Sequence, residues 1–217
     1  MTTDIFHKKL IELKKEVLKM GKLAKNMLCE SIDALRDLDT ELANSVMDRK
    51  VDIANYDQDI EKDTLHLITL HQPMAIDMRI IGAILKIITY LTRIGRYAKE
   101  IAYIAIKLSD QSHVKKIVHL PQMAKTVGEM IEKALKSFDE MDTKYIENIS
   151  EMDDVVDEDE EGIFRECVTY MLEDQNTITR CMYYVMIARY LERCGDHACK
   201  ISEKAYYMIT GKHIEIK

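Results

Sequence analysis

Two pairs of carboxylates in the second half of the chain have a spacing that could bind a cation. Glu192 and Asp196 lie four residues apart, and so do Asp153 and Asp157. Side chains four residues apart leave the same face of a helix, where two like charges repel each other by a few tenths of a kcal/mol. Four carboxylates on two neighbouring helices could together hold a divalent or trivalent metal ion, because such ions favour oxygen ligands.

An earlier stretch of the chain repeats the last pair only in part. Tyr90–Ala98 matches Tyr190–Ala198 at the tyrosine, leucine, arginine, glycine and alanine positions. Thr92 and Arg96, however, stand where the later copy has its two carboxylates. The chain therefore presents one arrangement twice, with the acidic pair complete only in the second copy.

The other carboxylate pair has an earlier counterpart as well. Met47–Asp52 resembles Met152–Asp157, with Asp48 and Asp52 at the acidic positions. Arg96 could neutralise these two carboxylates by an ion pair and so take the place of a metal ion. We therefore predict that only the second copy binds metal in full.

The same residues also have a purely structural interpretation. Acidic side chains on an outward helix face are usually solvated, and Glu192 with Arg189, or Asp196 with Lys200, could form surface ion pairs worth at most about 1 kcal/mol. The spacing places both acidic residues roughly opposite the apolar stripe of their helix, so we expect them to face outward. Di-iron enzymes instead direct Glu-x-x-His pairs into a bundle core.

Composition indicates an all-helical protein and excludes several classes. The 217 residues include only seven Gly and two Pro, so helix breakers are few. The net charge of −7 argues against a nucleic-acid binder, which needs a basic face. Five cysteines without a C-x-x-C pair favour free thiols in a reducing compartment. We expect neither a signal peptide nor a transmembrane segment.

The apolar pattern predicts long helices. Apolar residues in Phe6–Leu38 recur at alternating spacings of four and three, as in helices that pack lengthwise. Asp39-Thr40 provides an N-cap for a second helix, predicted to run to about Gln72. Pro73 suits the first turn of a third helix, which we expect to end near Ser109.

The three-helix pattern then recurs after a polar segment at residues 110–120. Ala34-Leu35 returns as Ala134-Leu135, an offset of 100, and Asp39-Thr40 returns as Asp142-Thr143, an offset of 103. The match of Met47–Asp52 gives an offset of 105. We predict two tandem three-helix bundles related by internal duplication, in domains 1–110 and 111–217.

Two groups of motifs resemble those of the PhoU family of phosphate-uptake regulators. The first repeat has Gln72-Pro-Met-Ala-Ile-Asp-Met-Arg79, followed by Leu85-Lys-Ile and Arg93-Ile-Gly95. The second repeat has Leu191-Glu-Arg-Cys-Gly-Asp-His-Ala198 and Tyr207-Met-Ile-Thr-Gly211. The resemblance covers essentially the whole chain and implies the same fold of two three-helix bundles.

The resemblance also implies multinuclear metal clusters on the bundle surfaces. Iron is the first expectation, with Zn, Mn, Ni, Mg or Ca as alternatives. Carried over to this sequence, the ligands are Asp153, Asp157, Glu192 and Asp196, with Asp48 and Asp52 in an incomplete first site where Thr92 and Arg96 depart from the pattern. Arg193 would orient the last two ligands, and Gly195 would allow close helix approach.

The implied function is negative regulation of phosphate uptake and of phosphate-starvation signalling. Proteins of this family contact the ATPase subunit of the ABC phosphate transporter and, in many bacteria, a membrane sensor histidine kinase. We therefore expect a cytoplasmic adaptor, recruited to the inner face of the membrane through the transporter. The extended faces of long bundles favour a homodimer. Two alternatives stay open: a metal-dependent enzyme, for which no nucleophile or general base is identifiable, and a purely structural helical oligomer.

Overall fold

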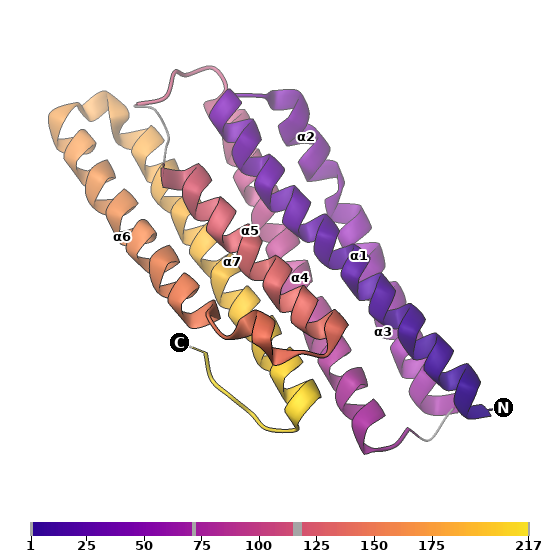
Figure 1. The fold of residues 1–217 in the computed structure, drawn as a ribbon. Coiled ribbons are helices and arrows are strands. Elements are labelled where there is room, and N and C mark those ends of the chain that lie inside the picture. The colour runs from indigo at the N-terminus through magenta and orange to yellow at the C-terminus, as the bar shows by residue number, and fades with distance from the viewer. Residues whose placement is uncertain (1, 71–72, 115–118, 217) are drawn as a thin grey trace.

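The computed structural model describes residues 2–70, 73–114 and 119–216, and no strand occurs among them (Figure 1). The helices are α1 (Thr2–Asp37), α2 (Thr40–Asp48), α3 (Lys50–Leu70), α4 (Ala75–Leu108), α5 (His119–Glu140), α6 (Ile149–Glu173) and α7 (Ile178–Thr210), with short 3-10 turns η1 (Thr143–Ile146) and η2 (Gln175–Thr177). The predicted all-α fold of two tandem three-helix bundles is confirmed. None of the described helices is both long and apolar enough to cross a membrane.

The middle helix of each repeat differs from the single long helix that the sequence predicts. In the first repeat it is interrupted at Arg49, which caps α2 before α3 begins at the next residue. In the second repeat η1 precedes α6. Both predicted N-caps are present: the Asp39 carboxylate accepts from the backbone N–H of Leu42 at 2.9 Å, and that of Asp142 accepts from Lys144 at 3.0 Å. The predicted helix end at Gln72 lies outside the described residues.

The backbone fixes the register between the repeats. Leu38 and Met141 both have positive φ, at 54° and 56°, directly before the capping aspartates, so position 38 corresponds to position 141. The buried positions of the middle helices agree with this offset of 103: Val46 with Ile149, Ile53 with Val156 and Ile60 with Ile163. The offset of 105 inferred from sequence is therefore wrong for the middle helix.

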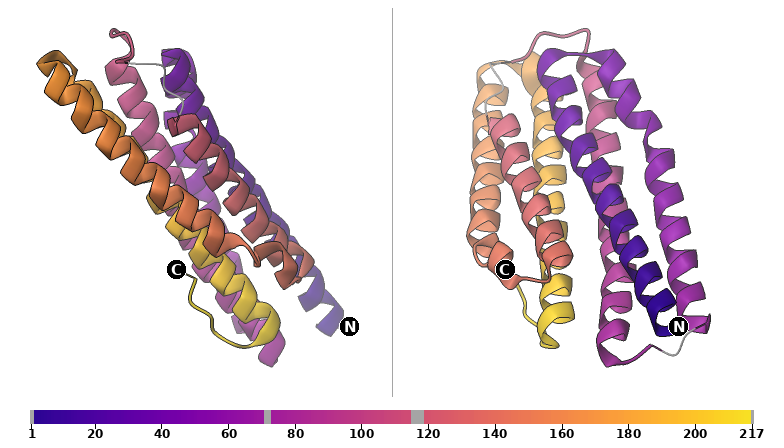
Figure 2. Two further views of the ribbon diagram at one scale, coloured as in Figure 1. Left: turned by 60° about the vertical axis from the view of Figure 1, so that its left-hand side comes forward. Right: turned by 45° about the vertical axis from the view of Figure 1, so that its right-hand side comes forward.

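The two repeats face each other through antiparallel helices. In α4 and α7, Tyr97 stacks on Tyr190 at 5.4 Å between ring centroids, and Tyr90 lies against His197 at 5.7 Å. The last helices of the two repeats follow the offset of 100, so positions 90 and 97 of α4 correspond to positions 190 and 197 of α7. The contact of position 97 with 190 therefore repeats the contact of position 197 with 90, with the two helices exchanged. Such reciprocal pairing is typical of a two-fold symmetric interface, here between two copies within one chain. Figures 1 and 2 show α4 and α7 running in opposite directions side by side.

The buried apolar residues of both repeats form one continuous core. The largest fully buried side chains come from both repeats; they include Met20, Met27, Leu91 and Phe138. α4 contributes apolar residues to its own bundle and also packs along α7, while α1 packs along α5. The two bundles therefore share one hydrophobic core.

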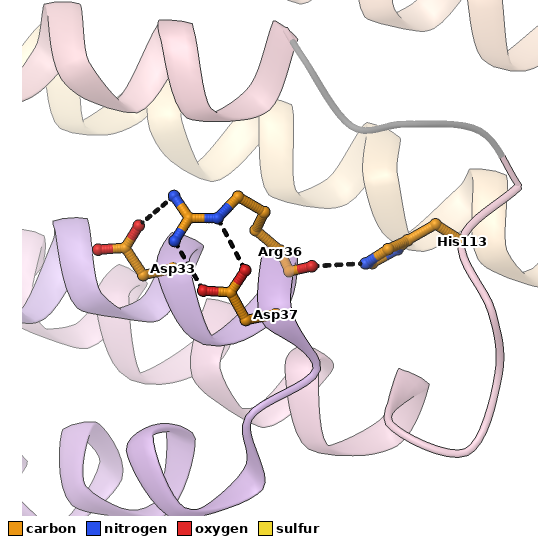
Figure 3. Close-up of polar contacts among 4 residues, drawn as sticks. All are labelled: Asp33, Arg36, Asp37 and His113. Atoms are coloured by element: carbon orange, nitrogen blue, oxygen red, sulfur yellow. Dashed lines mark hydrogen bonds and ion pairs between the residues drawn. The ribbon is translucent and has the colours of Figure 1, made fainter.

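In the segment that joins the repeats, His113 contacts a residue of each repeat. His113 hydrogen-bonds through Nε2 to the backbone carbonyl of Arg36, at 3.1 Å (Figure 3). Its Nδ1 lies 3.0 Å from the hydroxyl of Tyr184. The carbonyl can only accept, so Nε2 donates, and in a neutral imidazole the Tyr184 hydroxyl then donates to Nδ1. Figure 3 also shows the Arg36 guanidinium between Asp33 and Asp37.

Candidate functional site

The four predicted ligands of the second repeat come from two helices that pack against each other, α6 and α7. Asp153 and Glu192 are each only 9% exposed, whereas Asp157 is exposed and the side chain of Asp196 is 40% exposed. The cluster thus runs from the buried contact between the helices out to the surface.

Gly195 makes this close packing possible. A Cβ atom at this position would lie 3.2 Å from Asp153 Oδ1 and 3.5 Å from a methyl group of Val156. Because real Cβ contacts are seldom as short as the first of these distances, a side chain here would force Asp153 to shift by a few tenths of an ångström. The structure therefore supports the close helix approach expected at this glycine.

Glu192 does not face outward as the helical wheel predicts. Its side chain is 11% exposed, 3.1 Å from Arg189 and 3.4 Å from Arg193. The wheel locates the apolar stripe that faces α4 and α5, but it cannot show that α6 covers the adjoining flank. The expected pair of Glu192 with Arg189 is present, whereas Asp196 pairs with Arg193 at 2.8 Å and Lys200 bonds Glu203 instead.

The carboxylates affect one another electrostatically. Burial, reinforced by the charge of Asp196 and opposed by the two nearby arginines, raises the pKa of Glu192 to about 7. Burial likewise raises the pKa of Asp153 to about 6; a hydrogen bond with Cys199 opposes this shift and the charges of Asp157 and Asp196 add to it. In addition, Oε2 of Glu192 is buried without a hydrogen-bond partner. The site concentrates negative charge that its own cations compensate only in part.

Carboxylate oxygens are hard ligands and suit a hard metal ion, and one of them, Glu192 Oε2, has no hydrogen bond although Arg193 Nε lies 3.4 Å away. Their present positions do not converge, because no group of three or more His, Cys, Asp or Glu side chains within residues 2–70, 73–114 and 119–216 is arranged to hold a metal. Arg193 engages Asp196, and Arg189 engages Glu192. A bound metal would therefore require the carboxylates to turn away from these arginines.

The first repeat does not assemble the predicted counterpart. Asp48 and Asp52 are both exposed, and Asp52 lines a surface hollow formed by residues of α1 and α3, including Leu23. Within the described part of the chain, Arg96 forms no ion pair with either aspartate, so the predicted internal neutralisation is wrong. The offset of 103 explains this, because positions 50 and 54, rather than the two aspartates, correspond to Asp153 and Asp157.

Sequence reasoning missed several residues of these surfaces. Thr92 donates a hydrogen bond to Asp57 at 2.9 Å, which makes Asp57 its partner on α3. Glu160, at the position equivalent to Asp57, lies 3.5 Å from Arg189. Cys199 hydrogen-bonds with Asp153. Glu160 could have been noticed because it follows Asp157 by almost one helical turn, whereas nothing in the sequence indicated the role of Cys199.

Comparison with known proteins now identifies the family. The model of the PhoU domain matches residues 17–105 and again residues 120–205. The chain belongs to the PhoU family. The two matches lie on either side of the boundary predicted at residues 110 and 111, and the resemblance drawn from the two groups of motifs is confirmed.

Two PhoU relatives match over nearly their whole lengths. The chain is 38% identical over 213 residues to the phosphate-specific transport system accessory protein PhoU homolog of Aquifex aeolicus, covering 97% of this chain and 96% of that protein. It is 30% identical over 217 residues to the protein of the same name from Clostridium acetobutylicum, covering 100% and 99%.

Two solved PhoU structures have the same fold. PhoU from Pseudomonas aeruginosa superposes with a TM-score of 0.91 at 31% identity, covering 95% of this chain and 100% of that one. The phosphate transport system regulatory protein PhoU from Streptococcus pneumoniae gives a TM-score of 0.88 at 25% identity, covering 97% and 99%. The chain therefore shares its fold with both of these PhoU structures, at 31% and 25% sequence identity.

The contact at Gly195 predicts that Gly195→Val lowers the free energy of unfolding by about 1–3 kcal/mol, because the branched side chain would overlap Asp153 and Val156. Urea unfolding followed by circular dichroism measures this. Gly162→Ala on α6 is the matched control, since nothing lies within 4 Å of its Cβ position. It should stabilise by up to about 1 kcal/mol. Equal effects of the two substitutions would contradict the close helix contact.

The raised pKa of Glu192 predicts how stability changes with pH. Its carboxyl has an ordinary pKa of 4.5 and a folded pKa of about 7, so the folded state holds the proton more tightly and stability falls as pH rises between these values. In metal-free buffer, the stability of Glu192→Gln relative to wild type should rise by about 1–2 kcal/mol from pH 4.5 to about pH 8, discounted for solvent screening.

Urea titrations at several pH values measure this difference. Glu61→Gln, which removes an exposed charge from α3 of the other repeat, is the control. If the relative stability of Glu192→Gln stays flat or falls with rising pH, burial of the ionised carboxyl is not costly.

Proposed function

We propose that this chain regulates phosphate uptake as an accessory protein of a phosphate transport system. The observation that carries the proposal is the match of both repeats to the PhoU domain, together with relatives named as accessory or regulatory proteins of phosphate transport. Those names describe accessory and regulatory proteins rather than enzymes, which supports a non-enzymatic role over the metal-dependent enzyme considered from the sequence.

The proposal has a more specific form. The chain acts as a negative modulator, and its partner is the ATPase subunit of the ABC phosphate transporter; a sensor histidine kinase is a second partner in bacteria that have one. It works at the cytoplasmic face of the membrane and as a homodimer. Long helices with exposed outer faces support contact with other proteins, because an adaptor needs extended surfaces rather than an enclosed catalytic pocket.

The carboxylate cluster between α6 and α7 is proposed to bind metal, with iron first and Zn, Mn, Ni, Mg or Ca as alternatives. The side chains that would hold it are Asp153, Asp157, Glu192 and Asp196. Support comes from their gathering at one helix contact and from the buried oxygen of Glu192 that has no hydrogen-bond partner. A bound cation would supply the positive charge that the arginines provide only in part, and so would stabilise the packing of the two helices.

Deletion of the gene for this chain tests the regulatory function. Uptake of radiolabelled phosphate by phosphate-replete cells should rise several-fold, because a negative modulator of the transporter has been lost. Restoring the wild-type chain should return uptake to its original rate. Unchanged uptake after deletion would overturn the proposed function.

Metal analysis of the purified protein tests the proposed centre. After anaerobic purification with iron or manganese supplied, the wild type should carry stoichiometric metal, and Glu192→Gln/Asp196→Asn should lose it because two of the four ligands are gone. Asp48→Asn/Asp52→Asn is the matched control in the first repeat and should keep the wild-type content. Sub-stoichiometric metal in the wild type, or equal content in wild type and Glu192→Gln/Asp196→Asn, would leave the carboxylates as a partly buried charge cluster without metal.

A further inference from the structure

The outer face of the α6–α7 hairpin exposes large apolar side chains close to the turn that joins the two helices. Three lie on α6 and three on α7, in each case four residues apart. They are Phe164, Val168, Leu172, Ile178, Met182 and Met186, with exposed fractions of 52%, 38%, 84%, 43%, 50% and 40%. We refer to these six residues as the hairpin patch. Single exposed apolar residues are ordinary, but a contiguous group marks an interaction surface.

The geometry of the two helices shows that the six side chains are contiguous. Cys167 of α6 and Cys181 of α7 are buried and in hydrogen-bond contact across the helix pair. α6 and α7 are antiparallel, so the next residue on each helix, Val168 and Met182, turns toward the same outer side. Their neighbours four residues before and after continue both rows on that side. The rows are about 12 Å long at 1.5 Å per residue.

The six equivalent positions of the first repeat are less apolar, although two of them, Leu65 and Met78, are exposed apolar residues at 49% and 43%. On the middle helix, the positions equivalent to Phe164, Val168 and Leu172 are Glu61, Leu65 and Thr69. On the last helix, those equivalent to the other three are Met78, Gly82 and Lys86. Three further exposed apolar residues of the first repeat, Leu70, Met74 and Ile76, lie at the end of α3 and the start of α4, at positions that do not match the patch. Both repeats bury the same core positions, so core packing does not account for the two four-residue rows found only in the second. The matched positions also provide an internal control.

The charges around the patch indicate what can cover it. α6 contains ten Asp or Glu residues and a single Arg, Arg165, which pairs with Glu161 at 3.5 Å. Close to the patch, Glu173 beside Leu172 is exposed and forms no ion pair among the described residues, whereas α7 contributes the cations Arg180 and Arg189. A second copy of this chain would bring another α6 with the same negative charge against the first, which is unfavourable. Phosphate, nucleic acid and anionic lipid are disfavoured for the same reason. A partner with a basic surface has the complementary charge.

We infer that the hairpin patch binds an amphipathic helix of a partner protein, one with an apolar stripe at helical spacing and Lys or Arg beside it. Such a helix would lie along the patch, between the row on α6 and the row on α7, in a recurring mode of helix recognition. Its apolar side chains would meet the patch and its basic residues the exposed carboxylates of α6. Two of the six patch residues are methionines, which adapt their shape to a bound apolar surface. The inference deepens the proposed function by naming the chemistry of the partner and the surface that receives it.

A synthetic amphipathic peptide of leucine and lysine, about 18 residues long, tests this site on the full-length chain. With methionine methyl groups labelled with carbon-13, its addition should shift the NMR signals of Met182 and Met186. Met74 and Met78, which are exposed in the first repeat at 77% and 43%, should not shift. Equal shifts in both repeats would overturn the inference by showing that the peptide adheres to any exposed apolar residue.

Substitutions provide the second arm of the test. Phe164→Ser/Met182→Ser should weaken peptide binding at least about ten-fold. Leu65→Ser/Met78→Ser, the matched change in the first repeat, should leave it unchanged. Circular dichroism checks that both variants fold, as expected for exposed positions. Equally tight binding of a peptide of leucine and glutamate would overturn the inference that the partner is basic. Self-association of the chain that Phe164→Ser abolishes would also overturn it, and would identify a second copy of the chain as the occupant of the patch.

This experiment and the uptake assay fail separately. Peptide binding at the patch is measured without the transporter, so a chain that binds the peptide yet leaves uptake unaltered would keep the surface and overturn the regulatory function. If deletion of the gene raises phosphate uptake but the chain does not bind the peptide, the regulatory function stands and the proposed binding surface is overturned.

Discussion

The structure depends on the burial of long apolar stripes that no single three-helix unit covers completely. α4 presents apolar side chains both to its own bundle and to α7, and α1 does the same toward α5. Each repeat therefore completes the core of the other, through antiparallel contacts in which Tyr97 meets Tyr190 and Tyr90 meets His197. Because those contacts are reciprocal, one set of complementary side chains serves both copies.

This arrangement leaves different parts of the two repeats free to diverge. The core faces and caps are held in register, as the paired positive φ angles of Leu38 and Met141 show. The outer face of the middle and last helices is not used for joining the repeats. There the second repeat carries the carboxylate cluster and the hairpin patch, and the first carries the hydrogen bond between Thr92 and Asp57. Duplication thus supplied one scaffold with two different outer faces.

The carboxylate cluster illustrates a compromise between packing and electrostatics. Gly195 lets α6 approach α7 closely enough to bury Asp153 and Glu192, and the same approach removes water from their charges. The pKa of each group rises as a result, chiefly through burial. Arg189 and Arg193 offset part of the cost but leave one oxygen of Glu192 without a hydrogen-bond partner. Partly compensated buried charge of this kind is common at functional sites.

The sequence by itself determined the helical class, the duplication, the capping aspartates and the family, because apolar period, helix breakers and short motifs are local properties. Only the tertiary structure decided the register of the middle helices, the burial of Glu192 and the failure of Arg96 to meet Asp48 and Asp52. A single helical wheel shows which face of α7 is apolar, but not which neighbouring helix covers its flank. Likewise, the similar residues at Met47–Asp52 and Met152–Asp157 indicated an offset of 105 between the middle helices. The buried positions show that the offset is 103, because burial in the core rather than residue identity determines which positions are equivalent.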